Sequence, residues 1–340
     1  MMRRVILGLV MGAAALGSYA QTGGRLLVAV KGTQSLVIVD PAAGKVIASV
    51  SEGKLPGKDT AHEVAASRDG RLAYLPIYGD SGVGKPGSDG RTMVVIDVAA
   101  RKIVDTVDFG HAVRPHLPVL GPPVAGHPDG LLYVTTELDK AVAILDPKSF
   151  KILGSIPTGQ AESHMLAVSH DGKWGYTANV GPGTVSVLDL TARKLVTVIP
   201  VSGTVQRISV SPDDRMVFTS DQTKPELVVI DAATRKIAKR VPMESYGYGT
   251  APTPDGRWLL VPLMAVDKIA VIDLKTMTVA KNIELAKGTH PQEALVEPDG
   301  KMAFVSCDHS GQVAEIDTAN WTVTRMIDTG KVSDGLAWAR

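Results

Sequence analysis

The sequence predicts an all-β fold, a single seven-bladed β-propeller of four-stranded blades over residues 21–340. Three observations predict it. An apolar run ending in aspartate occurs seven times, a tight turn recurs between its copies, and almost no stretch has the apolar period of a helix. The 340 residues carry 36 basic and 35 acidic side chains. This balance creates no global field for nucleic acid or an anionic membrane, so neither is an expected partner.

The amino terminus, residues 1–20, has the parts of a secretory signal peptide. Met1–Arg4 is basic, Val5–Leu16 is apolar, and small residues precede a cleavage point before Gln21. We therefore expect a periplasmic or secreted protein with no membrane contact after cleavage. A membrane anchor is the alternative, but the apolar run is shorter than the roughly 20 residues that span a bilayer.

The apolar run that ends in aspartate continues, after a turn, with a basic residue and a second apolar run. Consecutive aspartates lie 57, 49, 43, 42, 42 and 44 residues apart. A period of about 42 residues is that of a four-stranded propeller blade. The seven aspartates are Asp40, Asp97, Asp146, Asp189, Asp231, Asp273 and Asp317.

The tight turn lies between two apolar strands and occurs six times, against seven aspartates. Residues 25–30 have the pattern of a second strand, and residues 335–339 have that of a first strand. We therefore expect the carboxyl-terminal strand to complete the amino-terminal blade, which pairs two exposed edges and favours a monomer. The turns begin at Asp69, Asp129, Asp171, Asp213, Asp255 and Asp299.

Together with strands such as residues 132–136, this repeat resembles that of the YVTN-type β-propeller family, in its exported bacterial form. The resemblance covers essentially the whole mature chain. It implies the architecture strongly and the activity weakly, because one fold hosts many functions. Propellers of this shape include secreted binding proteins, lactonase-like hydrolases, a streptogramin lyase, and the haem- or copper-carrying propellers of denitrification.

Strand direction alternates within a blade, so the long, irregular connections share one face of the ring, where function normally lies on a rigid scaffold. We expect residues 78–91, which are rich in glycine, to form a mobile flap beside the mouth of the central channel. Six of the eight histidines fall on this face: His62, His111, His116, His164, His290 and His309.

The residue seven positions before each turn aspartate should enter the innermost strand at the channel mouth. By this register the ring consists of His62, Pro122, His164, Gln206, Tyr248 and Gln292, with Asp334 as the seventh member. A concave polar mouth is the default ligand site of such a fold. With neighbouring positions included, the predicted ligand-binding residues are His62, Glu63, Arg114, His116, Glu162, His164, Gln206, Arg207, Tyr248, His290, Gln292 and Glu293.

The leading interpretation is an exported propeller that binds a small molecule or a protein partner at this mouth. The alternative is a metal-assisted or acid–base hydrolase or lyase, lactonase-like, that uses the histidines and glutamates of the mouth. The third is a propeller that carries haem or metal for redox chemistry. The sequence leaves open whether the protein is an enzyme, and the cofactor it suggests is a divalent metal.

The metal hypothesis rests on His62 and His164, which occupy equivalent positions two blades apart and could converge across the channel. His116 and His290 could join them, because imidazole is a common ligand of zinc, copper and nickel. The other interpretation is that these imidazoles hydrogen-bond loop backbone around a wet channel.

A non-covalent haem could instead be held by His62 or His164. Arg114 and Arg207 would then pair with its carboxylates, or else form salt bridges to the protein's own glutamates. The glutamates in reach are Glu63, Glu162 and Glu293.

Two local motifs suggest functions that we do not expect. Residues 79–85 fit the start of a phosphate-binding loop, but Pro86 replaces the hydroxyl residue and the segment joins two strands. Cys307, Asp308 and His309 suggest a metal or nucleophile site, but they lie in an outer loop, so we predict a buried thiol. A single cysteine also excludes an intrachain disulfide framework and covalent c-type haem.

Overall fold

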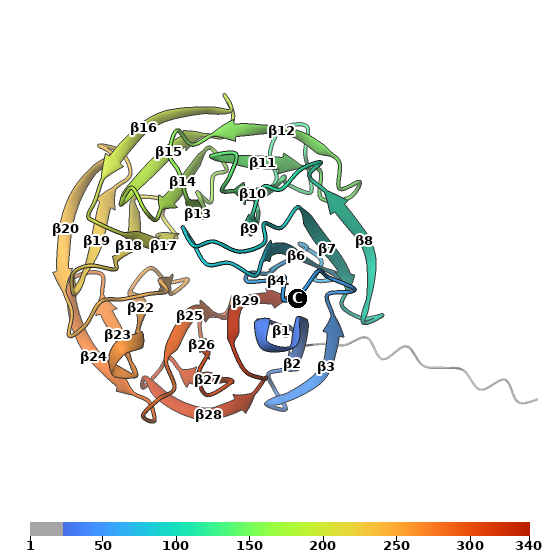
Figure 1. Cartoon of the computed structure of the whole chain (residues 1–340). Helices are drawn as coiled ribbons and strands as arrows, with labels where there is room; N and C mark the ends of the chain where they lie inside the picture. Colours follow the sequence, from blue (N-terminus) through green and yellow to red (C-terminus); the bar gives the residue numbers. More distant parts are fainter. Residues whose placement is uncertain (1–22) are drawn as a thin grey trace, which may run out of the picture.

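The computed structural model describes residues 23–340, so the predicted signal peptide lies outside the described residues. Seven antiparallel sheets stand in a ring around a central channel, with one strand of each at the centre and one at the periphery (Figure 1). This arrangement confirms the predicted seven-bladed propeller.

Each blade is named here by its place in the chain, and its strands are given from the innermost outward. Blades 1 to 4 contain β29 (Ser333–Ala339), β1 (Arg25–Val30), β2 (Ser35–Asp40), β3 (Lys45–Ser51); β4 (Thr60–Ala61) with β5 (Ala65–Ala66), β6 (Leu72–Gly79), β7 (Thr92–Asp97), β8 (Lys102–Asp108); β9 (Pro115–Leu120), β10 (Leu132–Thr136), β11 (Ala141–Leu145), β12 (Ile152–Pro157); β13 (Ser163–Val168), β14 (Trp174–Asn179), β15 (Thr184–Asp189), β16 (Lys194–Pro200).

Blades 5 to 7 follow the same order, and two short 3₁₀ helices complete the structure. The elements are β17 (Val205–Val210), β18 (Met216–Asp221), β19 (Glu226–Asp231), β20 (Lys236–Pro242); β21 (Ala251–Pro252), β22 (Trp258–Leu263), β23 (Lys268–Asp273), β24 (Thr278–Glu284); β25 (Pro291–Val296), β26 (Met302–Cys307), β27 (Gln312–Asp317), β28 (Thr322–Asp328); η1 (Lys31–Thr33) and η2 (Met264–Val266).

Both ends of the described chain contribute to blade 1, as predicted. The last strand, β29, pairs antiparallel with β1, and Leu26 lies opposite Trp338. Hydrogen bonds between β1, the first strand, and β29, the last strand, therefore close the ring. Closure pairs the inner edge of β1 with β29, so β1 has a partner on both edges.

The repeated aspartate is explained by the turn between the third and fourth strands. The Asp97 carboxylate accepts the backbone N–H of Ala100 at 2.7 Å, and Asp189 accepts that of Ala192 at 2.7 Å. Four residues after the aspartate the chain takes a left-handed conformation, with φ of 57° at Arg101. The aspartate thus caps a turn by a local side-chain bond and is not a site residue.

The core lies between the blades. Among residues 23–340 the buried apolar side chains form seven clusters, one at each contact between neighbouring blades. The middle strands are buried on both faces, as in β1 and β11, and therefore read as continuous apolar runs. This packing fixes the inner strands and so makes the channel mouth a rigid site.

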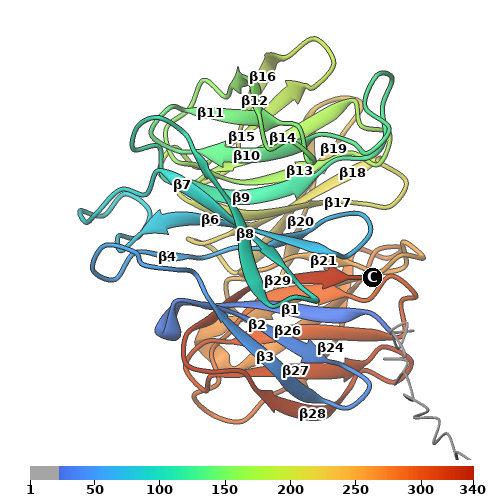
Figure 2. The same ribbon diagram turned by 90° about the vertical axis from the view of Figure 1, so that its right-hand side faces the viewer.

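The irregular connections project from one face of the ring, which faces the viewer in Figure 1 and lies at the left in Figure 2. The largest projection is the loop between β6 and β7, coloured light blue (Figure 2). In Figure 1 the same loop reaches over the middle of the ring toward β13. No helix among the described residues is long and apolar enough to cross a membrane.

Candidate ligand site at the channel mouth

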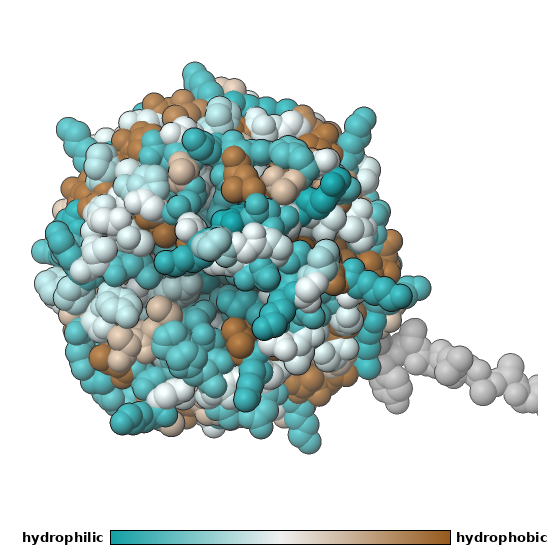
Figure 3. Space-filling model, in the orientation of Figure 1, coloured by the Kyte–Doolittle hydropathy of each residue, from teal (hydrophilic) through white to brown (hydrophobic). Residues whose placement is uncertain are grey.

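The first residues of the inner strands converge on the mouth of the channel, and Figure 3 looks onto that face. Hydrophilic residues surround its centre, while apolar residues are scattered over it (Figure 3). The side chains there form two groups on opposite sides of the mouth. We call them the histidine cluster and the arginine cluster.

The histidine cluster consists of residues from blades 2, 3 and 4. The rings of His116 and His164 stack with centroids 3.5 Å apart and an angle of 29° between their planes. The His62 ring stands edge-on to His116 at 5.5 Å and lies 4.7 Å from the ring of Tyr78. His116 therefore bridges the two histidines that the sequence paired. The members of the cluster are His62, Tyr78, His116, Glu137 and His164.

Glu137 holds one side of this cluster in place. One of its carboxylate oxygens accepts a hydrogen bond from the Tyr78 hydroxyl at 2.7 Å, and the other is hydrogen-bonded to Nδ1 of His164. Burial and the Glu137 charge raise the pKa of Tyr78, so the phenol keeps its proton. The ring of His164 is fixed by this pair and by its stacking on His116.

The other two imidazoles are neutral. Burial, assisted by the charge of Lys31, lowers the pKa of His62 to about 3. Burial lowers the pKa of His116 well below its usual range, and its Nδ1 has no hydrogen-bond partner among the described residues. His62 is half-buried, and its ring makes no hydrogen bond within residues 23–340. These nitrogens keep bonding capacity that the protein does not use.

The arginine cluster gathers four blades around one guanidinium. Arg207, on β17 and 2% exposed, pairs with Glu63 from blade 2. Its Nη1 also lies 2.8 Å from Glu293 on β25, and its Nη2 lies 3.2 Å from Asp334 on β29. The ammonium of Lys31, on η1, lies 2.6 Å from the second oxygen of Asp334. These five residues form a connected network across the channel.

Two cations face three carboxylates in this network, and the pKa values of the three carboxyl groups differ. Burial raises the pKa of Glu63 to about 8, against the opposing effect of Arg207. Burial likewise raises the pKa of Glu293. Although burial works in the other direction, Lys31 and Arg207 lower the pKa of Asp334 to about 2. Asp334 is thus favoured in its ionised form, whereas burial favours the protonated form of the two glutamates.

Gln206 and Tyr248 extend the arginine cluster toward solvent. The Arg207 guanidinium lies over the Tyr248 ring, 4.7 Å from its centroid, in a cation–π contact. The Gln206 side chain donates a hydrogen bond to the Tyr248 hydroxyl at 2.9 Å. Both side chains are half-buried.

The loop between β6 and β7, residues 80–91, forms the flap that the sequence predicted. Arg114 donates to the carbonyl oxygen of Lys85 at 3.0 Å and pairs with Asp89. At the tip, Gly84 lies against the Glu162 carboxylate of blade 4, which also accepts the N–H of Gly181 at 2.7 Å. The flap therefore spans the three blades that supply the histidines, and Arg114 and Glu162 hold it.

The sequence register was wrong in blade 3. Eleven residues connect β9 to β10, whereas five connect β13 to β14. The six extra residues move the predicted position from Pro122 to His116, which leaves Pro122 in a connection on the opposite face. His116 is thus the true ring member of this blade, and the structure brings it beside His164.

His290 and Gln292 belong to neither cluster. The Asp308 carboxylate accepts a hydrogen bond from Gln292 at 2.6 Å and is hydrogen-bonded to Nδ1 of His290 at 2.6 Å. His309 stacks on His290. The predicted metal group of His62, His164, His116 and His290 is therefore divided, because His290 lies apart with Asp308 and His309.

The two motifs set aside in the sequence have the local structure expected of them. Residues 79–85 join strand β6 to strand β7, so the helix of a phosphate-binding loop is absent from this segment of the described chain. Cys307 is fully buried, and burial raises the pKa of its thiol to about 12. A thiol with such a pKa is protonated and unreactive.

The sequence missed several residues that complete these groups. Tyr78 and Glu137 stand at the ends of second strands, where the register argument did not look. Lys31 follows β1, and Asp308 follows β26 in the motif that was set aside. A signal was present for each of them, since all are polar residues at the end of an apolar strand, or directly after it, on the irregular face.

Comparisons with known proteins agree on the architecture. Hydrazine synthase from Kuenenia stuttgartiensis has a TM-score of 0.69 at 19% identity, over 84% of this chain and 90% of that chain. The dihydro-heme d1 dehydrogenase NirN, in complex with DHE, has a TM-score of 0.65 at 17% identity, over 92% of this chain and 74% of that chain. At such identities the likeness shows the fold alone.

No curated protein matches the sequence. Residues 127–337 match the family model described as the Cytochrome D1 heme domain. The matched region contains three of the inner-strand residues of the arginine cluster, together with Glu137 and His164 of the histidine cluster. Since it spans more than half of the chain, the protein belongs to the Cytochrome D1 heme domain family.

Proposed function

We propose that this protein binds a haem-type tetrapyrrole at the channel mouth, where His62 would bind its iron. Two findings support the choice of ligand. The family is described by its haem domain, and a solved structure of the same fold, NirN, is a dihydro-heme d1 dehydrogenase. Haem was the third of the functions that the sequence left open.

The observation that carries the proposal is the state of His62. An axial ligand must offer a neutral imidazole nitrogen with a free lone pair. His62 is neutral, since its pKa is lowered to about 3, and its ring has no hydrogen bond among the described residues. It is also half-buried, whereas His116 and His164 are 1% and 2% exposed. Of the three imidazoles, His62 therefore has the best access for a ligand.

The residues around His62 fit a flat, partly apolar group. The buried rings of Tyr78 and His116 pack against His62 and hold it at the mouth, and the Nδ1 of His116 still lacks a partner within the described chain. An unpaired buried polar atom is costly unless a ligand or water satisfies it. A bound haem would supply a redox-active iron. The chain would ligate that iron through His62 and shield one side of the group with the flap.

The structure leaves fewer cations free to bind haem carboxylates than the sequence suggested, because Arg207 and Arg114 are already paired with carboxylates of the protein. Arg207 is surrounded by Glu63, Glu293 and Asp334, and so it forms the salt bridges that were the alternative to haem binding. Arg114 is committed to Asp89. The Lys31 ammonium lies 2.6 Å from Asp334, but its side chain is 23% exposed, so of the cations in the arginine cluster it is the one whose ion pair a haem carboxylate could reach and replace.

The test is a titration of the mature protein with ferric haem, followed by absorption. We expect stoichiometric binding with a shifted Soret band in the wild type and its loss in His62→Ala. His170→Ala is the matched control, since His170 lies outside the predicted ring and pairs with Asp214. Added imidazole should restore the Soret band in His62→Ala if the lost group is the iron ligand. An unchanged band in His62→Ala would overturn the proposal.

Export belongs to this proposal, with the signal peptide predicted over residues 1–20 as the route. The test is mass spectrometry of the periplasmic protein, which should begin at Gln21. The YVTN-type resemblance stays a prediction from the repeat. A lactonase-like activity also stays a prediction, and lactone hydrolysis by haem-free protein would favour it.

A further inference from the structure

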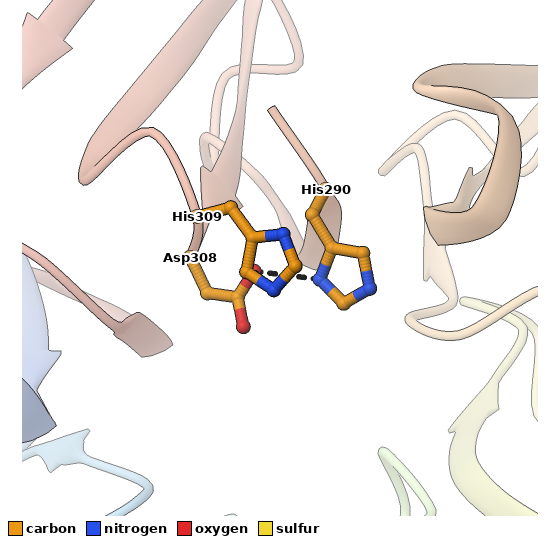
Figure 4. Close-up of side chains that lie close together, drawn as sticks. All are labelled: His290, Asp308 and His309. Carbon is orange, nitrogen blue, oxygen red and sulfur yellow. Dashed lines mark hydrogen bonds and ion pairs between the residues drawn. The ribbon is translucent and has the colours of Figure 1, made fainter. Parts of the chain in front are cut away.

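We propose that blade 7 carries a separate site for a divalent transition metal, formed by His290, Asp308 and His309. Zinc, nickel and copper(II) are the class of ion that two imidazoles and a carboxylate favour. The site is distinct from the proposed haem site and independent of it. It lies on the irregular face, where β25 begins and β26 ends (Figure 4).

The backbone brings these residues together. Pro291 on β25 lies opposite Cys307 on β26, so the residues just outside this pair, His290 and Asp308, face each other. The N–H of Asp308 donates to the carbonyl oxygen of His290 at 3.3 Å. His309 follows directly in the connection to β27 (Gln312–Asp317). The convergence therefore depends on the rigid strands of one blade.

The three side chains already point toward one another (Figure 4). Nδ1 of His290 lies 2.6 Å from the Asp308 carboxylate, and Nε2 of His309 lies 3.9 Å from the same oxygen. The two imidazole rings are parallel within 7°, with centroids 4.0 Å apart. One ligand atom from each residue lies within 4.8 Å of the others, and this is the single such group of three within residues 23–340.

A metal ion would need two small changes of distance and a tilt of the imidazole rings, because a ring nitrogen binds an ion in the plane of its ring and the two planes are now parallel. Zinc–nitrogen and zinc–oxygen bonds of about 2.0–2.1 Å in a tetrahedron place two ligand atoms about 3.3 Å apart. The 2.6 Å pair must therefore lengthen and the 3.9 Å pair must shorten, each by less than about 1 Å. His309 is the adjustable member, because its side chain is 63% exposed.

Neighbouring residues hold the ligands in the orientation that metal sites require. Gln292 donates to the second oxygen of Asp308 at 2.6 Å, which leaves the first oxygen for the metal. The backbone N–H of His290 donates to Asp267 at 2.8 Å, and Asp267 also accepts from Gly288 at 2.7 Å. Such outer hydrogen bonds fix ring and carboxylate orientation in known metal sites.

Three protein ligands leave one position of a tetrahedron open to water. Because His290 is half-buried and His309 is exposed, an ion can enter from solvent without rearrangement of the blade.

The experiment is calorimetric titration of haem-free His62→Ala protein with zinc chloride, repeated with cobalt(II) and its visible absorption. The His62→Ala background prevents the proposed haem ligand from contributing, so failure of one proposal is distinguishable from failure of the other. We expect one bound equivalent and a tetrahedral cobalt spectrum. The affinity for zinc should fall at least tenfold in His309→Ala and in Asp308→Asn. The tetrahedral cobalt absorption should weaken in the same variants.

His170→Ala provides the matched control, because His170 also pairs with an aspartate, Asp214, but has no second imidazole. It should bind zinc as the background protein does. Folding is checked by circular dichroism, and His309 is exposed enough that its removal should leave the blade intact. Equal zinc affinity in His309→Ala and the background protein, or no zinc binding in either, overturns the proposal.

Discussion

The two sides of the channel mouth use their polar groups in opposite ways. In the arginine cluster, Arg207 and Lys31 each lie within 3.2 Å of a carboxylate. In the histidine cluster, His62 and Nδ1 of His116 have no hydrogen-bond partner within the described chain. The arginine cluster is joined by ion pairs, although Arg207 Nε and Glu293 Oε2 make no hydrogen bond within the described chain. Ion pairs join parts of a fold, whereas an imidazole nitrogen without a partner is what a ligand needs. We therefore infer that the arginine cluster stabilises the ring and that the histidine cluster binds the ligand.

The positions of the partners in the chain support this division. Arg207 bonds to Glu63, 144 residues away, and to Asp334, 127 residues away. It therefore connects blade 5 to blades 1, 2 and 7 across the channel. The histidines come from the consecutive blades 2, 3 and 4, which already pack through the apolar clusters between them. The contacts among the histidines therefore contribute less to the stability of the propeller than the ion pairs of Arg207 do.

The largest effect is expected from Arg207→Met. Removal of the guanidinium leaves three buried carboxylates with one remaining cation, and breaking such a pair costs about 3–5 kcal/mol. The free energy of unfolding, measured by urea denaturation, should fall by that amount. Arg207→Lys should recover part of it.

The control for this loss is Arg91→Met. Arg91 pairs with Asp108, but their side chains are 51% and 54% exposed. Such a surface pair contributes about 0–1 kcal/mol. Equal losses in Arg207→Met and Arg91→Met would contradict the structural role of the arginine cluster.

The next effect is expected in the histidine cluster from Tyr78→Phe. The change removes the hydrogen bond to Glu137 and leaves that buried carboxylate with one partner, His164. A hydrogen bond to a charged group contributes about 1.5–3 kcal/mol. Tyr74→Phe is the control, since the Tyr74 hydroxyl donates to a neutral carbonyl at 3.2 Å and should contribute about 1 kcal/mol. Urea denaturation of both variants measures the difference.

The fold could be predicted from the sequence because each blade repeats the same local chemistry. An aspartate that caps its own turn, such as Asp97, leaves a mark at a fixed period. Ring closure followed from an unmatched strand at each end. Most mouth residues followed from register, since the innermost strand always enters at the same face. The extra residues between β9 and β10 broke that register, and Pro122 was placed wrongly.

The grouping of the mouth residues could not be predicted. Register assigns a residue to the ring, but side-chain rotamers decide whether Glu63 turns toward Arg207 or toward His62. The contact of Asp308 with His290 was not predicted either, because it depends on the pairing of β25 with β26. Contacts between blades depend on packing that no local pattern encodes.

The pH dependence of stability can separate the carboxylates of the arginine cluster. The folded-state pKa of Glu293 is raised by burial, so its favourable contribution is present below its unfolded pKa of about 4.3 and is lost as pH rises through the folded pKa. Glu293→Gln imitates the protonated form. The stability of this variant relative to wild type should therefore increase as the pH rises from the unfolded pKa of about 4.3 through the raised folded-state pKa.

Asp334→Asn should behave differently in the same measurement. The pKa of Asp334 is lowered to about 2, so its contribution is present above the unfolded value of about 3.9 and is lost as pH falls through 2. Its stability relative to wild type should stay constant over the same pH interval. Parallel pH profiles for the two variants would show that the network does not share its protons as described.

The smallest effect on stability is expected from a substitution in the flap. The same substitution tests most directly whether the histidine side of the mouth is the binding side. Gly84 has a φ of 63°, and a Cβ atom there would lie 2.9 Å from the Glu162 carboxylate. Gly84→Ala should push the tip of the flap away from blade 4. Gly57→Ala is a matched control, because Gly57 has a φ of 52° and nothing within 4 Å of the added atom. Each substitution should cost about 1 kcal/mol through backbone strain alone.

The two variants should differ in access to the histidine cluster. His116 and His164 are 1% and 2% exposed beneath a flap that spans blades 2 to 4. Diethyl pyrocarbonate should therefore modify both histidines several-fold faster in Gly84→Ala than in Gly57→Ala, as mapped by mass spectrometry. The urea midpoints of the two variants should agree, since the flap does not contact the arginine cluster. Equal modification rates would mean that the inner strands, and not the flap, bury these histidines, and the binding side of the mouth would then be as closed as the structural side.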